Sequence, residues 1–443
     1  MIETVRNAWK IPELRRKIIF TLFILLIYRV GNAVPVPYVN LTLLEQYFSS
    51  MGNTALGLMN AMSGGAFSRA TIFALSIQPY INSSIIIQLL TVAIPALERL
   101  QKDGGEEGKK KLAAITRYVT VAIALLQGFG YYSLMRVGTA SSGTMLTDSS
   151  FWAGAVIVLS FTAGSTFVMW LGEQITEFGI GNGISIILFA SIVARGPSML
   201  YSLFIGLRNH YSGIALQKGA VNFSGLGVAG ILVGLIAIVI FIVFISLAER
   251  RIPIQYAKRV VGRKMYGGQS SHLPIKLSMT GVMPIIFAQA IATLPATVAA
   301  FLPSPKTGSF WSGFLSAIGT TSPIYIIVYF LLILGFSYFY ASIQFNPIEI
   351  SNNLKKNGGF IPGFRPGKPT ADFIRHVLGK ITLFGAIYLA VIAIVPIITG
   401  AAINVSSLAI GGTSVIIVVG VALETVKALE AQMLMRHYKG FLE

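Results

Sequence analysis

The feature that most constrains this chain is a series of ten apolar segments. An α-helix needs about 20 mostly apolar residues to cross the hydrocarbon core of a bilayer, whereas transmembrane β-strands are shorter and alternate in polarity. The segments lie at residues 18–38, 71–93, 113–135, 152–171, 182–203, 226–247, 281–302, 323–343, 378–398 and 408–426. The sequence therefore predicts an all-α polytopic membrane protein with ten transmembrane helices.

The composition supports this class. Only 11% of the residues are charged and 54% are hydrophobic, whereas soluble domains carry roughly 25% charged residues. The first apolar segment follows the basic stretch MIETVRNAWKIPELRRK and lacks a small-residue cleavage site, so it is interpreted as a transmembrane helix and not as a signal peptide. The chain has no cysteine, which excludes disulfides and thiol catalysis.

The basic residues predict the orientation of the chain. Most of its 34 Lys and Arg lie in the N-terminal tail, in the loops after the second, sixth and eighth segments, and at the C-terminal end. Because Lys and Arg concentrate in cytoplasmic loops, both termini are expected in the cytoplasm.

Two of these basic loops are long. Loop 248–280 has a partial alternation that predicts a short hairpin near Gly267-Gly268, and 344–377 has the Gly, Pro and Asn spacing of an ordered loop.

Ten segments divide into two groups of five near residue 210, which gives an N-terminal half, 1–210, and a C-terminal half, 211–443. Because five is odd, the halves face opposite ways, an inverted-repeat plan whose functional site lies between the halves. Pro79 and Pro284 interrupt the second segment of each half. The apolar stretch 52–68 is too short to span and is typical of a re-entrant helix enclosed by protein.

The sequence contains no motif for covalent chemistry. The four His lie in different segments without metal-ligand spacing, and GFRPGKPT has Pro362 and Pro369 where a phosphate-binding loop needs Gly and Ser or Thr. We therefore expect no enzyme activity, no metal and no cofactor. The inverted halves suggest an ion-coupled small-solute transporter as the alternative function, but acidic residues are nearly missing from the apolar segments. A purely structural membrane subunit is a third interpretation.

Aliphatic residues occupy positions where a transporter would place polar ligands. They lie beside Gly, Pro or polar residues in the second, fifth, seventh and tenth segments. The set is Ile77, Ile81, Ile184, Ile187, Leu188, Val282, Ile286, Ile416 and Ile417. Ordinary helix packing explains any one of them alone, whereas together they predict an apolar site between the halves.

Five stretches resemble the SecY family, the central subunits of bacterial protein-conducting channels. They are SGGAFSRATIFALSIQPYINSSIIIQLL, MWLGEQITEFGIGNGISII, YAKRVVGRKMYGGQSSHLPIKLS, FNPIEISNNLKK and FIPGFRPGKPT. The resemblance runs from YRVGNAVPVP to GGTSVIIVV and covers nearly the whole chain. It implies a clamshell of two five-helix halves in the bacterial cytoplasmic membrane. Unfolded secretory polypeptides would cross through its pore, and transmembrane segments would leave sideways through a lateral gate.

The resemblance also implies roles for single residues. An aliphatic ring would close the pore, and such a ring resists ions because it dewets. Its members would be Ile77, Ile81, Leu188 with Ile184 sharing its role, Val282 or Ile286, and Ile417. A plug helix at about 55–68, hinged at its glycine pair, would include Ala55, Leu58, Met62, Gly64, Gly65 and Phe67. Gln88 and Gln127 would be polar residues of the lateral gate, where spans two and three meet spans seven and eight.

The basic loops would dock partners. The ribosome, through its RNA, or the SecA motor ATPase would contact Lys258, Arg259, Arg263, Lys355, Lys356 and Arg365. Phosphate-rich RNA attracts such clusters, although the same charges would also set topology and contact anionic lipids. Membership of the family further implies small SecE and SecG subunits.

Overall fold

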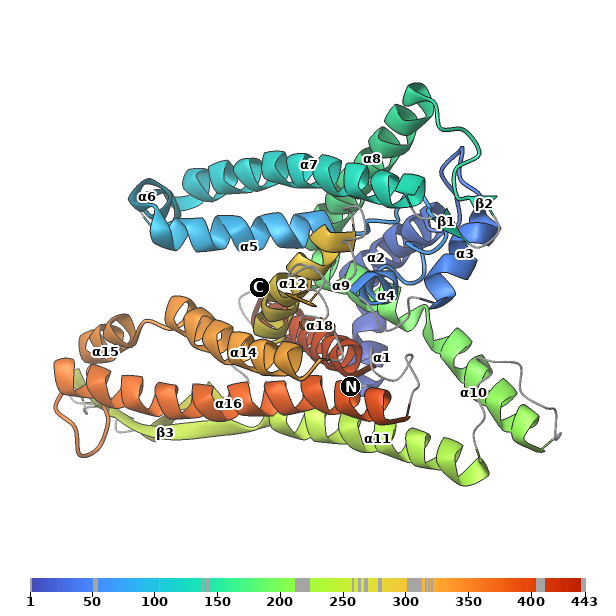
Figure 1. Cartoon of the computed structure of the whole chain (residues 1–443). Coiled ribbons are helices and arrows are strands. Elements are labelled where there is room, and N and C mark those ends of the chain that lie inside the picture. Colours follow the sequence, from blue (N-terminus) through green and yellow to red (C-terminus); the bar gives the residue numbers. More distant parts are fainter. Residues whose placement is uncertain are drawn as a thin grey trace.

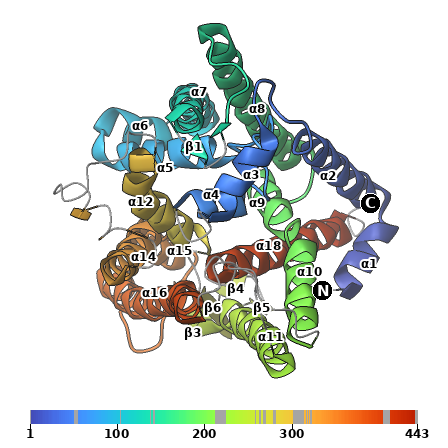
Figure 2. The same cartoon turned by 45° about the vertical axis from the view of Figure 1, so that its right-hand side comes forward.

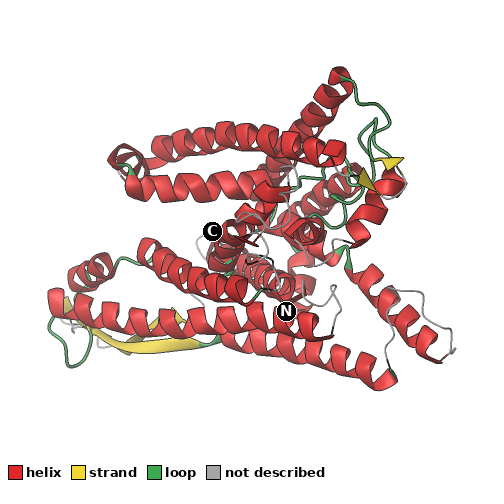
Figure 3. Cartoon of the chain, viewed as in Figure 1, coloured by secondary structure: helices red, strands yellow, loops and turns green. Residues whose placement is uncertain are grey.

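The structure is a computed structural model in which residues 2–50, 55–102, 104–137, 139–140, 143–211, 224–256, 259–261, 264–266, 270–277, 281–300, 313–314, 317, 319, 322–403 and 411–439 are described. Helices dominate these ranges, and the few strands lie at two ends of the molecule (Figure 3). Each of the ten predicted segments contains a helix.

The helices of the N-terminal half are α1 (Ile2–Lys10), α2 (Pro12–Gly31), α3 (Leu41–Ser50), α4 (Ala55–Met62), α5 (Gln78–Ala93), α6 (Pro95–Lys102), α7 (Gly105–Val137), α8 (Phe151–Phe178), α9 (Gly183–Val193) and α10 (Gly196–Tyr211). Those of the C-terminal half are α11 (Gly225–Leu247), α12 (Met283–Ala300), α14 (Pro323–Gln344), α15 (Pro347–Lys356), α16 (Lys368–Ile403) and α18 (Gly411–Lys439). The strands are β1 (Thr139–Ala140), β2 (Gly143–Thr144), β3 (Glu249–Tyr256), β4 (Arg259–Val261), β5 (Lys264–Tyr266), β6 (Ser270–Lys276) and β7 (Gly359–Phe360).

Six helical stretches of the described residues are long and apolar enough to cross a membrane. They are Gly105–Arg136, Phe151–Phe178, Gly183–Arg208, Gly225–Leu247, Pro323–Lys356 and Lys368–Ile398. The pair α5 and α6, two helices that meet at an angle of 106°, makes a seventh when it is counted as one broken span. The helices at the first, seventh and tenth predicted spans, α2, α12 and α18, do not meet this criterion of length and hydropathy. The chain is nonetheless plainly polytopic.

Three predicted spans differ in detail from the structure. Residues 71–77 form turns, and α5 begins only at Gln78, so that Pro79 lies in its first turn. Pro284 likewise lies in the first turn of α12. Proline is tolerated there because the first helical N–H groups have no intrahelical partner, so both prolines start helices and do not interrupt them. The predicted span 182–203 is divided by a turn at Ala194 and Arg195.

The helices form two groups with a central set between them (Figure 1). In the first group α5 packs on α7 and α7 on α8, and in the second α14 packs on α16 and α12 on α14. The two groups meet where α9 contacts α18 and where α4 contacts both α9 and α12. Helix α4 lies near the centre of the bundle when the molecule is turned (Figure 2). A short helix of the N-terminal half is therefore enclosed between the two groups.

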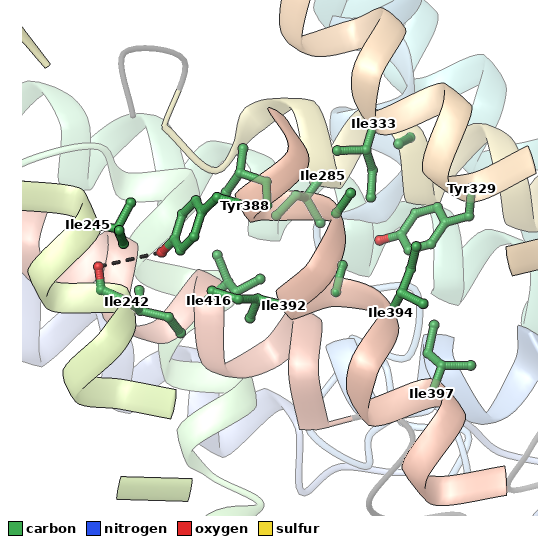
Figure 4. Packing of buried hydrophobic residues seen from close by; sticks show 14 of the residues in the cluster. Ile242, Ile245, Ile285, Tyr329, Ile333, Tyr388, Ile392, Ile394, Ile397 and Ile416 are labelled. Atoms are coloured by element: carbon green, nitrogen blue, oxygen red, sulfur yellow. Dashed lines mark hydrogen bonds between the residues drawn. The ribbon is translucent and has the colours of Figure 1, made fainter. Parts of the chain in front are cut away.

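The core of the second group is aliphatic and aromatic. Ile285, Tyr329, Ile333, Tyr388 and Ile416 pack together between α12, α14, α16 and α18 (Figure 4), and the Tyr388 hydroxyl donates to the backbone carbonyl of Ile242 at 3.5 Å in α11. Lipid tails are as apolar as these side chains, so close packing and hydrogen bonds hold such helices together, and the hydrophobic effect contributes little.

A small sheet lies at one end of the molecule. Strands β6, β3 and β7 are antiparallel, and Glu249 pairs with Lys276 in the β3–β6 ladder. Ile252, Ile254 and Ile275 of the sheet pack against α15 and α16. The predicted hairpin is therefore present, although Gly267 and Gly268 lie outside the described residues. The sheet, α6 and α15 share this end, and β1, β2 and α3 lie at the opposite end (Figure 1).

Candidate functional site

The predicted aliphatic residues meet in one cluster between the two helix groups. Ile77, Ile81, Leu188, Ile286 and Ile417 are at most 8% exposed and pack together, with Ile184 and Val282 partly buried against them. They come from the start of α5, from α9 and α12, and from α18. All seven are therefore brought to one place, and because both Val282 and Ile286 lie there, the packing does not choose between them. That this cluster closes a pore stays a prediction.

The neighbouring isoleucines of the predicted set divide between two environments. Ile187 is fully buried in the same central cluster. Ile416 packs in the core of the second helix group and also lines a cavity together with Leu188 and Ile417, so its place in the site between the halves stays a prediction. Consecutive residues on an α-helix point about 100° apart, which is why Ile417 packs in the central cluster and Ile416 in the core of the second group.

Polar caps and glycines bring these helices close together. The Asn182 side chain accepts hydrogen bonds from the backbone N–H groups of Ile184 at 3.1 Å and Ser185 at 3.4 Å, and so begins α9. A Cβ at Gly183 would overlap the carbonyl oxygen of Gly172 in α8. The local sequence GIGNGIS therefore fixes where α9 starts and how closely it approaches α8.

The predicted plug segment is a buried helix with a glycine turn after it. Helix α4 ends at Met62, which packs in the central cluster. Gly64 and Gly65 follow with φ of +71° and +88°, a backbone conformation that glycine adopts without strain. A Cβ on Gly64 would lie 2.7 Å from the carbonyl oxygen of Ser191 in α9. The turn therefore brings the plug segment against α9, and a larger residue does not fit at Gly64.

Phe67 fixes the far end of the plug segment. Its ring is 1% exposed and stacks on Tyr131 of α7 at a centroid distance of 4.2 Å, and the Tyr131 hydroxyl donates to the Phe67 carbonyl. The side chains of Ala55 and Leu58 lie outside the described residues. Leu56 and Met59, which sequence reasoning missed, are also buried in α4, and their three-residue spacing with Met62 is the helical signal that would have found them.

A buried hydroxyl network lies beside the cluster and was also missed. The Tyr28 hydroxyl of α2 is 3.0 Å from Oγ of Ser76 and 2.7 Å from Oγ of Ser191. Ser165 of α8 donates to the Ser76 carbonyl at 3.1 Å. Ser76 has a φ of +49°, and it directly precedes Ile77. The network therefore holds an unusual turn at the point where the chain enters the aliphatic cluster.

At least three cavities border the cluster, and Leu188 lines two of them. One, of about 590 Å³, is lined by Leu188, Ile286 and Ile417 together with Lys276, Glu424 and Lys427. Another, of about 350 Å³, shares Leu188 and Ile286 and is lined by Ile81 and Gln88. Lys427 lies beyond the predicted span 408–426, and burial in the first cavity, with help from the Lys276 ammonium, lowers its pKa. The aliphatic side chains thus form a wall at the base of partly polar cavities.

The two predicted gate glutamines line different cavities. Gln88 of α5 lines the cavity of about 350 Å³ together with Tyr340 of α14, so it lies where the two helix groups face each other. Gln127 of α7 lines a cavity of about 440 Å³ between α5, α7 and α12, together with Met59 and Gln289. Its buried Oε1 has no hydrogen-bond partner among the described residues. Both glutamines therefore lie along the line where the two groups face each other.

The predicted docking residues that can be described are exposed. Lys355 and Lys356 lie in the last turn of α15, and Arg365 lies in the loop between β7 and α16. The loop is held because Phe364 stacks on Phe373 at 4.2 Å and Thr370 donates to the Arg365 carbonyl at 2.8 Å. Lys258 and Arg263 lie outside the described residues, and of Arg259 only its backbone position in β4 is described. No trio of His, Cys, Asp or Glu resembling a metal site occurs in the described part of the chain.

These features define the class of the protein. Two groups of membrane-length helices, an aliphatic cluster between them, and cavities bordering that cluster are the architecture of a polytopic helical channel. The comparisons identify the family. The SecY family model matches residues 71–426. The protein translocase subunit SecY of Streptomyces galbus is 45% identical over 452 residues, and that of Mycobacterium tuberculosis is 42% identical over 458 residues, with 100% of each chain covered. The chain belongs to the SecY family.

Solved structures show the same fold. One solved structure, that of a protein conducting channel, matches this chain with a TM-score of 0.61 at 15% identity, and 97% of each chain is covered. Sec61 in the canine ribosome-channel complex from the endoplasmic reticulum matches with a TM-score of 0.60 at 16% identity and the same coverage. The expected all-helical polytopic fold of this family is thereby confirmed.

Proposed function

We propose that this chain is the channel subunit of a bacterial protein translocase, through which unfolded polypeptides cross the cytoplasmic membrane. The observation that carries the proposal is the convergence of Ile77, Ile81 and Leu188 from one helix group with Ile286 and Ile417 from the other. An aliphatic constriction excludes ions by dewetting. It also offers no hydrogen-bond pattern, so a polypeptide of any sequence can pass between the same side chains.

The chemistry of the buried residues disfavours the transporter alternative. Among the described residues, the buried polar side chains are Thr, Ser, Asn and Gln, and none carries a charge. Ion-coupled transport uses ionisable groups within the membrane. A channel through which a polypeptide passes needs no such ionisable groups. A partner must then supply the energy for directional movement.

The proposal assigns roles to the two halves, residues 1–210 and 211–443. The plug segment around α4 occupies the space between them while no polypeptide is present, and it moves about Gly64 and Gly65 when one enters. The lateral gate is the line between α5 and α7 on one side and α12 and α14 on the other. Parting there exposes a transmembrane segment to lipid. A central Leu or Ile then favours lipid by about 0.5 kcal/mol and a central Lys or Arg opposes it by about 3 kcal/mol.

The basic loops are the proposed cytoplasmic face, with both termini on that side. SecA or a ribosome would dock on the exposed Lys355, Lys356 and Arg365 and on the basic residues of 248–280. Related structures are described as ribosome-channel complexes, which supports the ribosome as a partner. SecE and SecG would bind the apolar outer surface, and anionic lipids would meet the basic ends of the helices.

Photocrosslinking tests the proposed function. A photoreactive residue at Ile81, 7% exposed in the cluster, is expected to crosslink to a secretory polypeptide stalled during translocation. The control is the same residue at Phe244, which is 71% exposed on the outer surface of α11. Equal crosslinking at the two positions, or none at Ile81 while the polypeptide is engaged, would reject a path through the cluster.

A further inference from the structure

Met62 receives hydrogen bonds from both helix groups. It is the last residue of α4, and its Sδ lies 2.9 Å from Nε2 of Gln78 and 3.7 Å from Nε2 of Gln289. Gln78 is the first residue of α5, and Gln289 belongs to α12. A thioether sulfur is a weak acceptor, yet this one lies between two amide donors from opposite sides. We call Met62, Gln78 and Gln289 the sulfur clasp.

Burial increases the energetic cost of losing these contacts. Met62 is 6% exposed and Gln289 is 3% exposed, and Oε1 of Gln289 has no partner among the described residues. A buried amide that loses its remaining partner incurs a desolvation penalty larger than the net value of the bond it made. Moving Met62 away would therefore leave the Gln289 amide with neither end paired. In the closed arrangement, the single sulfur atom of Met62 accepts from both the Gln78 and the Gln289 side-chain amides.

We infer that Met62 is a positioning residue which couples the seating of α4 to the approach of the two helix groups. The inference rests on the proposed function. The sulfur can accept from both amides only while α5 and α12 stand on either side of it. Separation of the groups breaks one contact and frees α4 to leave, and departure of α4 removes a link between the groups. The clasp thus biases both motions toward the same closed state.

The chain offers a matched control in Met59. It lies one turn earlier in α4, is 8% exposed, and lines the same cavity of about 440 Å³ as Met62 and Gln289. Its sulfur accepts no hydrogen bond among the described residues. Replacement of either methionine by leucine preserves most of the side-chain volume, but only Met62→Leu removes an acceptor from two amides. The pair of variants therefore separates the hydrogen bonds from the packing.

The test measures ion conductance of the full chain, purified with its accompanying membrane subunits, in planar lipid bilayers without substrate. Met62→Leu is expected to raise the conductance by about tenfold, the effect of losing one to two weak buried bonds, while Met59→Leu stays near wild type. Gln289→Leu, which leaves Met62 in place, is expected to raise it by less, because this substitution also removes the buried amide that Met62→Leu leaves unpaired. The double variant Met62→Leu/Gln289→Leu should then leak no more than Met62→Leu alone.

Three outcomes would overturn the clasp. They are equal conductance of Met62→Leu and Met59→Leu, wild-type conductance of Gln289→Leu, and a double variant whose effects multiply. Because Gln289→Leu and Met62→Leu test the same contact from two sides, misfolding of one still leaves a decisive measurement. Translocation of a secretory protein by the wild-type preparation is measured in parallel. Its failure would count against the proposed function, whereas a translocating wild type with any of the three outcomes refutes only the clasp.

Discussion

The Tyr28 hydroxyl lies 2.7 Å from Oγ of Ser191, although 163 positions separate the two residues. This contact joins α2 to α9, and the same hydroxyl reaches Ser76 at 3.0 Å. Tyr28 is 1% exposed and its ring stacks on Phe73 at 5.9 Å. One phenol therefore fixes the turn that leads into the aliphatic cluster and the helix on which the plug segment rests.

Tyr28→Phe removes the hydroxyl and keeps the ring stacking. We expect a loss of about 1–2 kcal/mol in the free energy of unfolding, because two buried serine hydroxyls lose a partner. Thermal unfolding of the purified protein in detergent measures it. Tyr388→Phe is the control, since that hydroxyl donates to the Ile242 carbonyl only at 3.5 Å, with the Ser246 side chain as a further partner, and its removal should cost less. A smaller loss for Tyr28→Phe than for Tyr388→Phe would contradict the role of the network.

Gly64→Ala tests the seat of the plug segment. The new Cβ would lie 2.7 Å from the Ser191 carbonyl oxygen and would adopt a φ of +71°, a conformation that costs L-residues about 1–2 kcal/mol even in open space. We therefore expect α4 to be displaced and ion conductance without substrate to increase.

The matched variant is Gly65→Ala. Its φ is +88°, but no atom lies within 4 Å of the added methyl, so it carries the backbone strain without the clash. If both variants conduct equally, the close approach to Ser191 contributes nothing to the seating of α4. If neither variant conducts more ions than the wild type, Gly64 does not help to close the channel.

The sequence predicted the aliphatic residues of the site but not the polar contacts that hold the surrounding helices in place. Their Gly, Pro and polar neighbours, together with the resemblance, singled out Ile77, Ile81, Leu188, Ile286 and Ile417, because aliphatic residues in such surroundings are unusual in a simple membrane anchor. All five meet in one cluster.

What the sequence did not predict depends on contacts between distant positions. Tyr28 looks like any aromatic residue near the end of a span until Ser191 is brought to it. Met62 looks like packing until Gln78 and Gln289 are placed on either side of its sulfur. The start of α5 was misjudged because residues 71–77 are as apolar as the helix that follows, and apolarity alone does not distinguish a buried turn from a helix.

Ile417→Asn is expected to breach the aliphatic cluster. A polar side chain at a constriction favours water and so lowers the barrier to ions, and ion flux into proteoliposomes should rise clearly above wild type. Ile416→Asn is the matched change one residue earlier, in the core of the second helix group. There a buried polar group costs about 1–3 kcal/mol of stability, so this variant should unfold at lower temperature with little leak. The reverse pattern, a leak in Ile416→Asn and only a loss of stability in Ile417→Asn, would show that Ile416 and not Ile417 belongs to the constriction.

Arg365→Glu tests the docking surface. Arg365 is exposed in a loop fixed by Phe364 and Thr370, so its substitution should leave folding and membrane insertion unchanged. Reversal of its charge replaces attraction to an anionic partner by repulsion, and translocation driven by SecA should fall to a small fraction of the wild-type rate, with the defect most severe at low salt. Arg375→Glu is the control, because Arg375 is also exposed but lies 3.6 Å from Asp372 within α16. Wild-type rates for Arg365→Glu, or equal defects in both variants, would mean that general surface charge and not this loop engages the motor.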